Sequence, residues 1–165
     1  MKFRFSQLHK KPHLSLEEEI TFSEEEVKRI PTLLALPQAE VEVDLSKEED
    51  FVHVVFHIKA HLVLECAYTL EPVDYPIDFE DELDFMYAQA DDEDEGMIYV
   101  GQDEVDLDPF ILGLIVTEIP LRVIKPGAKL PTGGKGYDIK SEEDYEKERS
   151  ERIDPRFAKL DEWEE

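Results

Sequence analysis

The feature that most constrains the fold is a periodic run of apolar side chains over residues 51–65. Every second position of this run is apolar, at Val52, Val54, Phe56, Ile58, Ala60, Leu62 and Leu64. A period of two places these side chains on one face of a β-strand, whereas a helix would scatter them around its axis. The run therefore predicts a sheet with one face buried against a core.

Two further segments continue the pattern on either side of this strand. Residues 41–45 alternate in the same way, and the polar residues 47–50 read as a hairpin connection that makes the two strands antiparallel. A third run points Val73, Tyr75, Ile77 and Phe79 inward, with the same parity at Leu83, Phe85 and Tyr87. Pro76 falls on the outer face, which favours an edge strand or a bulge there. Residues 97–100 add a short strand.

Helical signals flank the strands. Ser23 is placed as an N-cap with Glu26 at the third position of the following turn, and prolines 31 and 37 end this part of a helical or extended arm. Asp108 is placed as the N-cap of a second helix that Pro120 closes. The apolar stripe of that helix consists of Leu107, Phe110, Ile111, Leu114 and Ile115. Residues 141–152 form a highly charged helical segment.

Together these elements predict an α+β fold. We expect a single domain built on a mainly antiparallel twisted sheet or partly closed barrel, with one packed helix and helical terminal arms. Residues 1–130 would form an acidic α+β domain that includes the N-terminal arm. Residues 131–165 would form a basic glycine-rich loop and a charged helical tail.

Length and cysteine content limit the class of protein. The 165 residues suffice for one domain with a sizeable core. The single cysteine, Cys66, excludes an internal disulfide framework and thiolate zinc sites with several cysteines. No apolar run approaches the roughly 18 residues that cross a bilayer, so we expect a cytoplasmic protein with no membrane contact.

The negative charge is concentrated in the middle of the chain. The net charge is −24, and residues 41–120 hold 23 acidic groups against 2 basic ones. Such a field repels phosphate backbones and attracts cationic partners, so DNA is not an expected ligand of the central body. An acidic surface that only maintains solubility is the simpler explanation, and both stay open.

No catalytic or metal centre is expected, and no cofactor. His53, His57 and His61 share one face of a strand, but neighbours four residues apart lie about 13 Å apart, too far for two imidazoles to share an ion. The acidic residues 91–95 lack the spacing of a calcium loop and read as a solvated loop. Glu118 near the apolar stripe receives no role. No nucleophile, base or phosphate cradle is assembled, so the protein is not expected to be an enzyme.

A basic, glycine-rich stretch over residues 122–140 is the best candidate for contact with RNA or a partner. The residues proposed for this contact are Lys125, Lys129, Lys135, Tyr137 and Lys140. Lysines pair with phosphates, and a tyrosine ring can stack on a base. An ordinary flexible linker would have the same composition, so both interpretations remain.

The C-terminal segment carries a second apolar signal. Phe157, Leu160 and Trp163 recur in steps of three and follow the helix-starting pair Asp154-Pro155. This stripe would dock either on the domain's own core or on a partner. The charged residues 141–152 separate it from the body, which favours a partner.

Several motifs occur in an order that resembles the YceD family, the large ribosomal RNA subunit accumulation proteins. The central element is Cys66-Ala67-Tyr68-Thr69-Leu70-Glu71-Pro72-Val73, which matches the family pattern at Cys66, Thr69, Leu70, Glu71, Pro72 and Val73. The other elements are Phe5-Ser6-Gln7-Leu8, Gly134-Lys135-Gly136-Tyr137 and the tail Asp154-Pro155-Arg156-Phe157-Ala158-Lys159-Leu160. Tyr68 replaces the usual arginine, and Thr69 replaces a second cysteine that some members carry.

The resemblance implies a non-enzymatic role in making or retaining the RNA of the large ribosomal subunit. The expected partner is a large-subunit precursor particle, reached through a basic ribosomal protein and possibly through 23S ribosomal RNA. The alternative is an acidic interaction module that mimics nucleic acid or sequesters a basic protein.

Overall fold

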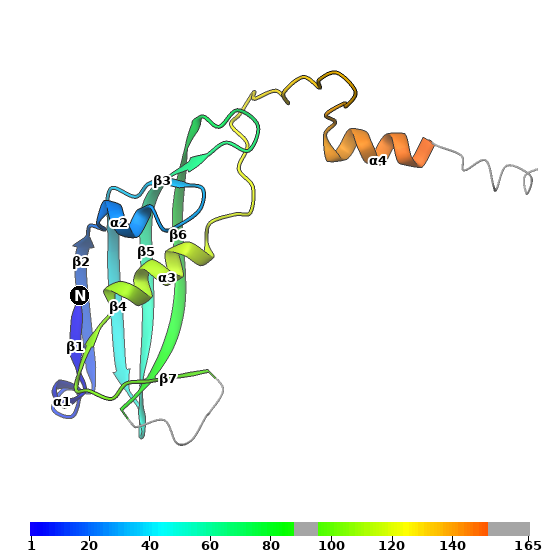
Figure 1. Cartoon of the computed structure of the whole chain (residues 1–165). Helices are drawn as coiled ribbons and strands as arrows, with labels where there is room; N and C mark the ends of the chain where they lie inside the picture. The colour runs from blue at the N-terminus through cyan, green and yellow to red at the C-terminus, as the bar shows by residue number, and fades with distance from the viewer. Residues whose placement is uncertain (88–95, 152–165) are drawn as a thin grey trace, which may run out of the picture.

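A computed structural model describes residues 1–87 and 96–151, and its main feature is one open, twisted sheet (Figure 1). The strand order is β2-β4-β5-β6-β7, and β3 also pairs with β5. The strands are β2 (His13–Ile20), β3 (Leu33–Ala35), β4 (Ala39–Lys47), β5 (Phe51–Glu65), β6 (Pro72–Met86) and β7 (Met97–Tyr99). All pairings are antiparallel except that of β6 with β7, which is parallel.

The sheet does not close on itself. Strand β1 (Lys2–Arg4) pairs with β8 (Glu104–Asp106) in a separate two-stranded ribbon and does not join the main sheet. The expected alternative of a partly closed barrel is therefore wrong. The fold is α+β with a sheet-rich core, as the alternation of residues 41–65 predicted.

The N-terminal segment, expected to be a helical or extended arm of the domain, contributes a strand to the main sheet. Residues 13–20 form β2, which pairs with β4 along its whole length. The short helices α1 (Phe5–Leu8) and α2 (Glu24–Val27) flank this strand. Ser23 caps α2 in the predicted capping box, because its hydroxyl accepts the Glu26 N–H and the Glu26 carboxylate accepts the Ser23 N–H.

The apolar face of the sheet lies against α3 (Asp108–Thr117) and the β1–α1 segment (Figure 1). The α3 side chains Ile111, Leu114 and Ile115 are buried. Asp108 is the first residue of α3, and Leu107 occupies the cap position assigned to Asp108 from the sequence. Leu107 is itself buried, so packing fixes this helix end.

The last described element stands apart from the sheet. Helix α4 (Glu142–Glu151) follows an extended segment and projects away from the body (Figure 1). Its position agrees with the predicted charged helix, and the Ser141 hydroxyl accepts the Asp144 N–H at its start. No helix among the described residues is long and apolar enough to cross a membrane.

Candidate interaction surfaces

The cysteine motif forms the turn between β5 and β6. The Cys66 N–H donates to the Glu71 carbonyl at 2.9 Å, and the Leu70 N–H donates to the Cys66 carbonyl at 2.9 Å. Leu70 has a positive φ of 58°, which an ordinary side chain adopts rarely. The turn buries Cys66 completely and leaves Leu70 68% exposed. We call residues 66–71 the Cys66 turn.

The Cys66 turn fixes the start of the basic segment, defined as residues 122–140. The Ala67 N–H donates to the Val123 carbonyl at 2.8 Å, and the Lys125 N–H donates to the Cys66 sulfur at 3.4 Å. The Lys125 ammonium also bonds the Glu71 carboxylate at 2.9 Å. Arg122 lies 5.7 Å from the centre of the Tyr68 ring, within cation–π range. The family motif therefore determines where the basic segment leaves the body.

These bonds also change the acidity of the cysteine. The backbone N–H of Lys125, followed by the Thr69 side chain, stabilises the thiolate and lowers the pKa of Cys66 to about 7. The sulfur is nevertheless buried, so a reagent in solution does not reach it in the folded state. The role that follows from this geometry is structural.

The basic segment is exposed, but its cations differ in their surroundings. Lys125 is paired with Glu71, and Lys140 with Glu148 and Asp138. The hydrogen bond to Glu148 raises the pKa of Lys140. Lys129 and Lys135 are exposed and form no ion pair with any described residue. Of the predicted contact lysines, these two are the ones available to a ligand.

The glycines of this segment hold Tyr137 in a tight turn. A β-carbon on Gly134 would lie 2.5 Å from the Tyr137 ring, and one on Gly133 would lie 2.6 Å from the Tyr137 carbonyl oxygen. Gly136 has a φ of +97°, which favours glycine. Tyr137 remains 64% exposed. The segment therefore leaves this ring accessible two residues after the exposed Lys135, as a stacking contact requires.

The opposite side of the sheet forms a second, acidic surface. Side chains on this side meet in rows across β2, β4, β5 and β6, and we call them the outer face. The rows are Glu19-Glu40-Lys59-Asp78, Glu17-Glu42-His57-Glu80, Ser15-Asp44-Val55-Glu82 and His13-Ser46-His53-Asp84. Carboxylates dominate these rows, with Lys59 as the lysine among them.

The three β5 histidines share one face of the strand, as predicted, and this face is the outer face. Two of them, His53 and His57, each contact a carboxylate of β6. His53 Nδ1 lies 2.8 Å from Asp84 Oδ1, and His57 Nδ1 lies 3.1 Å from Glu80 Oε2. Within the described residues, no group of three or more histidine, cysteine or acidic side chains could hold a metal ion. Cross-strand pairing is the interaction that this geometry shows for them.

The sequence interpretation missed one basic hollow near the N-terminus. A cavity of about 420 Å³ is lined by Lys2, Gln7, Leu8, Lys10, Lys11, Leu14 and Leu16. The sequence feature that could have indicated this hollow is the pair of adjacent lysines, Lys10 and Lys11, after Gln7-Leu8. The α1 turn brings these lysines over the β2 leucines, which composition alone does not reveal.

Several predicted residues lie outside the described part of the chain. These are the acidic run 91–95, the tail motif Asp154, Pro155 and Arg156, and the apolar stripe Phe157, Leu160 and Trp163.

Comparisons with known proteins agree with the motifs. Residues 54–162 match the family described as large ribosomal RNA subunit accumulation protein YceD. A Bacillus subtilis (strain 168) protein named "Uncharacterized protein YlbN" is 30% identical over 174 aligned residues, which cover 98% of this chain and 95% of that protein. No solved structure matches the chain. The family match includes both the Cys66 turn and the basic segment.

Proposed function

The chain belongs to the YceD family of large ribosomal RNA subunit accumulation proteins, and from this premise we propose a role in the biogenesis of the large ribosomal subunit. In this proposal the protein acts in the cytoplasm as a non-enzymatic factor. It supports the synthesis, processing or accumulation of 23S ribosomal RNA by binding a large-subunit precursor particle.

The observation that carries the proposal is the family match over residues 54–162. This range contains the Cys66 turn, which holds Lys125. It also contains the exposed residues Lys129, Lys135 and Tyr137. A basic segment with a presented aromatic ring suits a phosphate backbone and an unpaired base. The acidic body would repel the same RNA and suits a basic ribosomal protein.

The cellular test is the ratio of the two ribosomal RNAs. Removal of the protein from its host should lower mature large-subunit RNA relative to small-subunit RNA. Gradient profiles should show fewer large subunits, and both measurements are repeated under cold stress. Unchanged ratios and profiles under both conditions would contradict the proposal.

The molecular test removes Lys129 and Lys135, the predicted contact lysines that form no ion pair within the described part of the chain. Lys129→Gln with Lys135→Gln should weaken association with precursor particles and reduce its salt dependence. Each lost phosphate contact removes about 0.7 to 0.9 from the slope of log K against log salt concentration. The matched control, Lys28→Gln with Arg29→Gln at the two positions that follow α2, changes the charge equally and should leave the slope unaltered.

A second candidate function follows from the outer face. Its rows of carboxylates would also suit a module that mimics nucleic acid or sequesters a basic protein, without a ribosomal role. Salt-sensitive co-purification separates the two. Precursor particles of the large subunit support the first function, and a single basic protein supports the second.

A further inference from the structure

The outer face contains carboxylates that the fold leaves unneutralised. The Lys59 ammonium on β5 lies 3.5 Å from Asp78, and the His57 ring lies 3.1 Å from Glu80, so both side chains turn toward β6. On the other side of β5, no described residue forms an ion pair with Glu17, Glu19, Glu40 or Glu42. We call these residues the four glutamates.

The four glutamates also oppose one another across β2 and β4. Glu17 pairs directly with Glu42, and Glu19 with Glu40, in the strand register. Directly opposed side chains have β-carbons about 4.5 to 5.5 Å apart, and like charges at this spacing destabilise a sheet. The fold therefore carries a repulsion that a bound cation would relieve.

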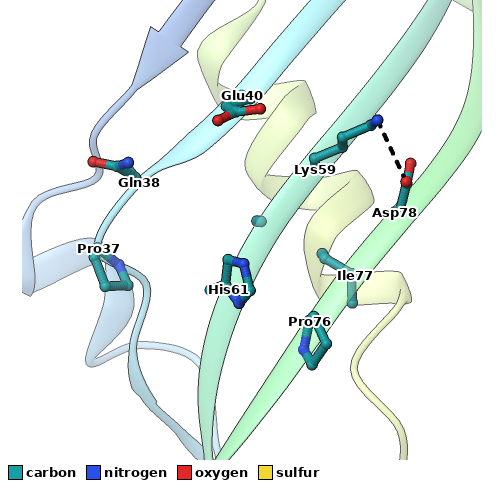
Figure 2. Close-up of a pocket in the computed structure, with 9 residues that line it drawn as sticks. Pro37, Gln38, Glu40, Lys59, His61, Pro76, Ile77 and Asp78 are labelled. Carbon is teal, nitrogen blue, oxygen red and sulfur yellow. Dashed lines mark ion pairs between the residues drawn. The ribbon is translucent and has the colours of Figure 1, made fainter.

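A hollow adjoins the four glutamates on the same face. It has a volume of about 600 Å³ and is lined by Pro37, Gln38, Glu40, Lys59, Ala60, His61, Pro76, Ile77 and Asp78. Figure 2 shows the rings of Pro37, His61 and Pro76 across one end, with Glu40 and the Lys59–Asp78 pair at the other. Glu40 has no ion-pair partner among the described residues, and the imidazole of His61 is the planar aromatic ring of the hollow. Both suit a guanidinium, which stacks on aromatic faces and binds a carboxylate through two parallel bonds.

We propose that the outer face docks an extended, arginine-containing basic segment of a protein partner, with one arginine in the hollow against Glu40. Further cations of the segment lie along the four glutamates. The inference rests on the proposed function and identifies the surface for its basic partner.

The charge of the face decides between possible occupants. RNA phosphates meet carboxylates here and are repelled, and a second copy of the chain would bring the same charge to the same face. A lysine segment supplies charge but not the planar fork, so arginine is favoured over lysine. The chain's own basic segment is the remaining competitor, and the experiment addresses it.

The test measures binding of a labelled peptide in which arginine alternates with threonine. Glu40→Gln with Glu42→Gln should weaken binding by about tenfold, because charge-assisted hydrogen bonds are lost. The matched control is Glu48→Gln with Glu49→Gln in the β4–β5 turn, at the other end of β4, which changes the net charge equally. It should alter binding less than twofold. Replacement of arginine by lysine in the peptide should weaken binding several-fold.

Other outcomes would overturn the docking site. Equal loss in the two double variants would mean nonspecific attraction to net charge. Tighter peptide binding by Lys129→Gln with Lys135→Gln would mean that the chain's own segment covers the face. Weaker binding of a single-stranded RNA oligonucleotide by Glu40→Gln with Glu42→Gln would mean that RNA uses this surface. Melting curves of each variant verify that it is folded.

The docking site and the proposed function fail in different ways. If removal of the protein lowers large-subunit RNA but the peptide binds wild type and Glu40→Gln with Glu42→Gln equally, only the docking site is wrong. If the peptide requires Glu40 and Glu42 but the ribosomal RNA ratio is unchanged on removal, the ribosomal role is wrong and the docking site stands.

Discussion

At the scale of single residues, Cys66 acts as a hydrogen-bond acceptor inside the body. Its sulfur receives the Lys125 N–H, and its side chain is fully buried. Cys66→Ser keeps an acceptor of similar size and should retain function with a small change in stability. Cys66→Ala leaves the Lys125 N–H without its partner and should lower the Tm by several degrees. Equal Tm values for both variants would show that the bond does not matter.

The same hydrogen bonds to Cys66 predict that the stability of the protein depends on pH. The folded pKa of Cys66 is about 7, below its ordinary value of 9.0. The stabilisation of the thiolate is therefore fully present above about pH 9 and is lost as the pH falls through about 7. The Tm advantage of wild type over Cys66→Ser should therefore grow as the pH rises from about 7 to about 9. An advantage that is constant with pH would contradict the lowered pKa.

Glu42 provides a test of the repulsion on the outer face. Glu42→Gln removes one of two directly opposed charges and should stabilise the protein by about 0.2 to 1 kcal/mol. For a chain of this size this corresponds to a rise in Tm of about 1 to 4 °C. High salt screens the repulsion, so the gain should shrink there. A lower Tm at low salt would mean that Glu42 has a stabilising partner.

At the scale of secondary structure, the sequence predicted the elements whose pattern is local. Alternation identified β4, β5 and β6, and the Ser23 capping box identified α2. Strand β2 was misinterpreted as part of an arm, because Glu17, Glu18 and Glu19 interrupt the alternation that β2 otherwise carries. Its pairing with β4 and the parallel pairing of β7 are tertiary facts that no local pattern encodes.

The surfaces were less predictable than the strands for the same reason. The bond between Lys125 and Cys66 joins residues 59 apart in sequence, so composition revealed the basic segment but not its anchor. The hollow beside Glu40 depends on the register of three segments. The sequence predicted the sign of the charge on each surface, and the fold determined which charges remain unpaired.

Strand β1 provides a test of whether the N-terminal segment is part of the packed core. Phe3 is 1% exposed, and its ring lies 5.3 Å from that of Phe5 and 6.0 Å from that of Phe85. Phe3→Ala should destabilise the protein by about 3 to 5 kcal/mol, as large core truncations do. Leu70→Ala, at an exposed position, is the control and should cost little. A small effect of Phe3→Ala would support a detachable N-terminal arm.

At the scale of the whole molecule, the acidic and the basic surface lie on different parts of the chain. The acidic outer face belongs to the sheet, whereas Lys129, Lys135 and Tyr137 lie on a segment held at the Cys66 turn. One protein can therefore contact a basic partner and a phosphate backbone without the two surfaces neutralising each other. We infer that this separation is what the fold contributes to its proposed role.

A fragment of residues 1–130 tests this separation. It keeps the outer face, the Cys66 turn and the Lys125 anchor, and it lacks Lys135 and Tyr137. None of the described residues that the fragment lacks, 131–151, belongs to the hydrophobic core cluster, so their loss removes no described core contact. The fragment should melt within a few degrees of the full chain, bind the arginine peptide normally and lose most association with RNA.

The same fragment also decides the role of the apolar stripe at Phe157, Leu160 and Trp163. Docking of this stripe on a partner leaves the melting temperature of the fragment close to that of the full chain, which is the expected result. Docking on the body would bury three large side chains, each worth about 1.5 to 3 kcal/mol, and the fragment would melt much earlier. The chain truncated after Ile153 distinguishes the two causes, because it keeps the basic segment and α4 and lacks the stripe together with the Asp154-Pro155-Arg156 motif. If it melts at the same temperature as the full chain and still binds RNA, the stripe does not dock on the body and the RNA contact does not require residues 154–165. Loss of association with precursor particles by this variant would then assign the stripe to a partner.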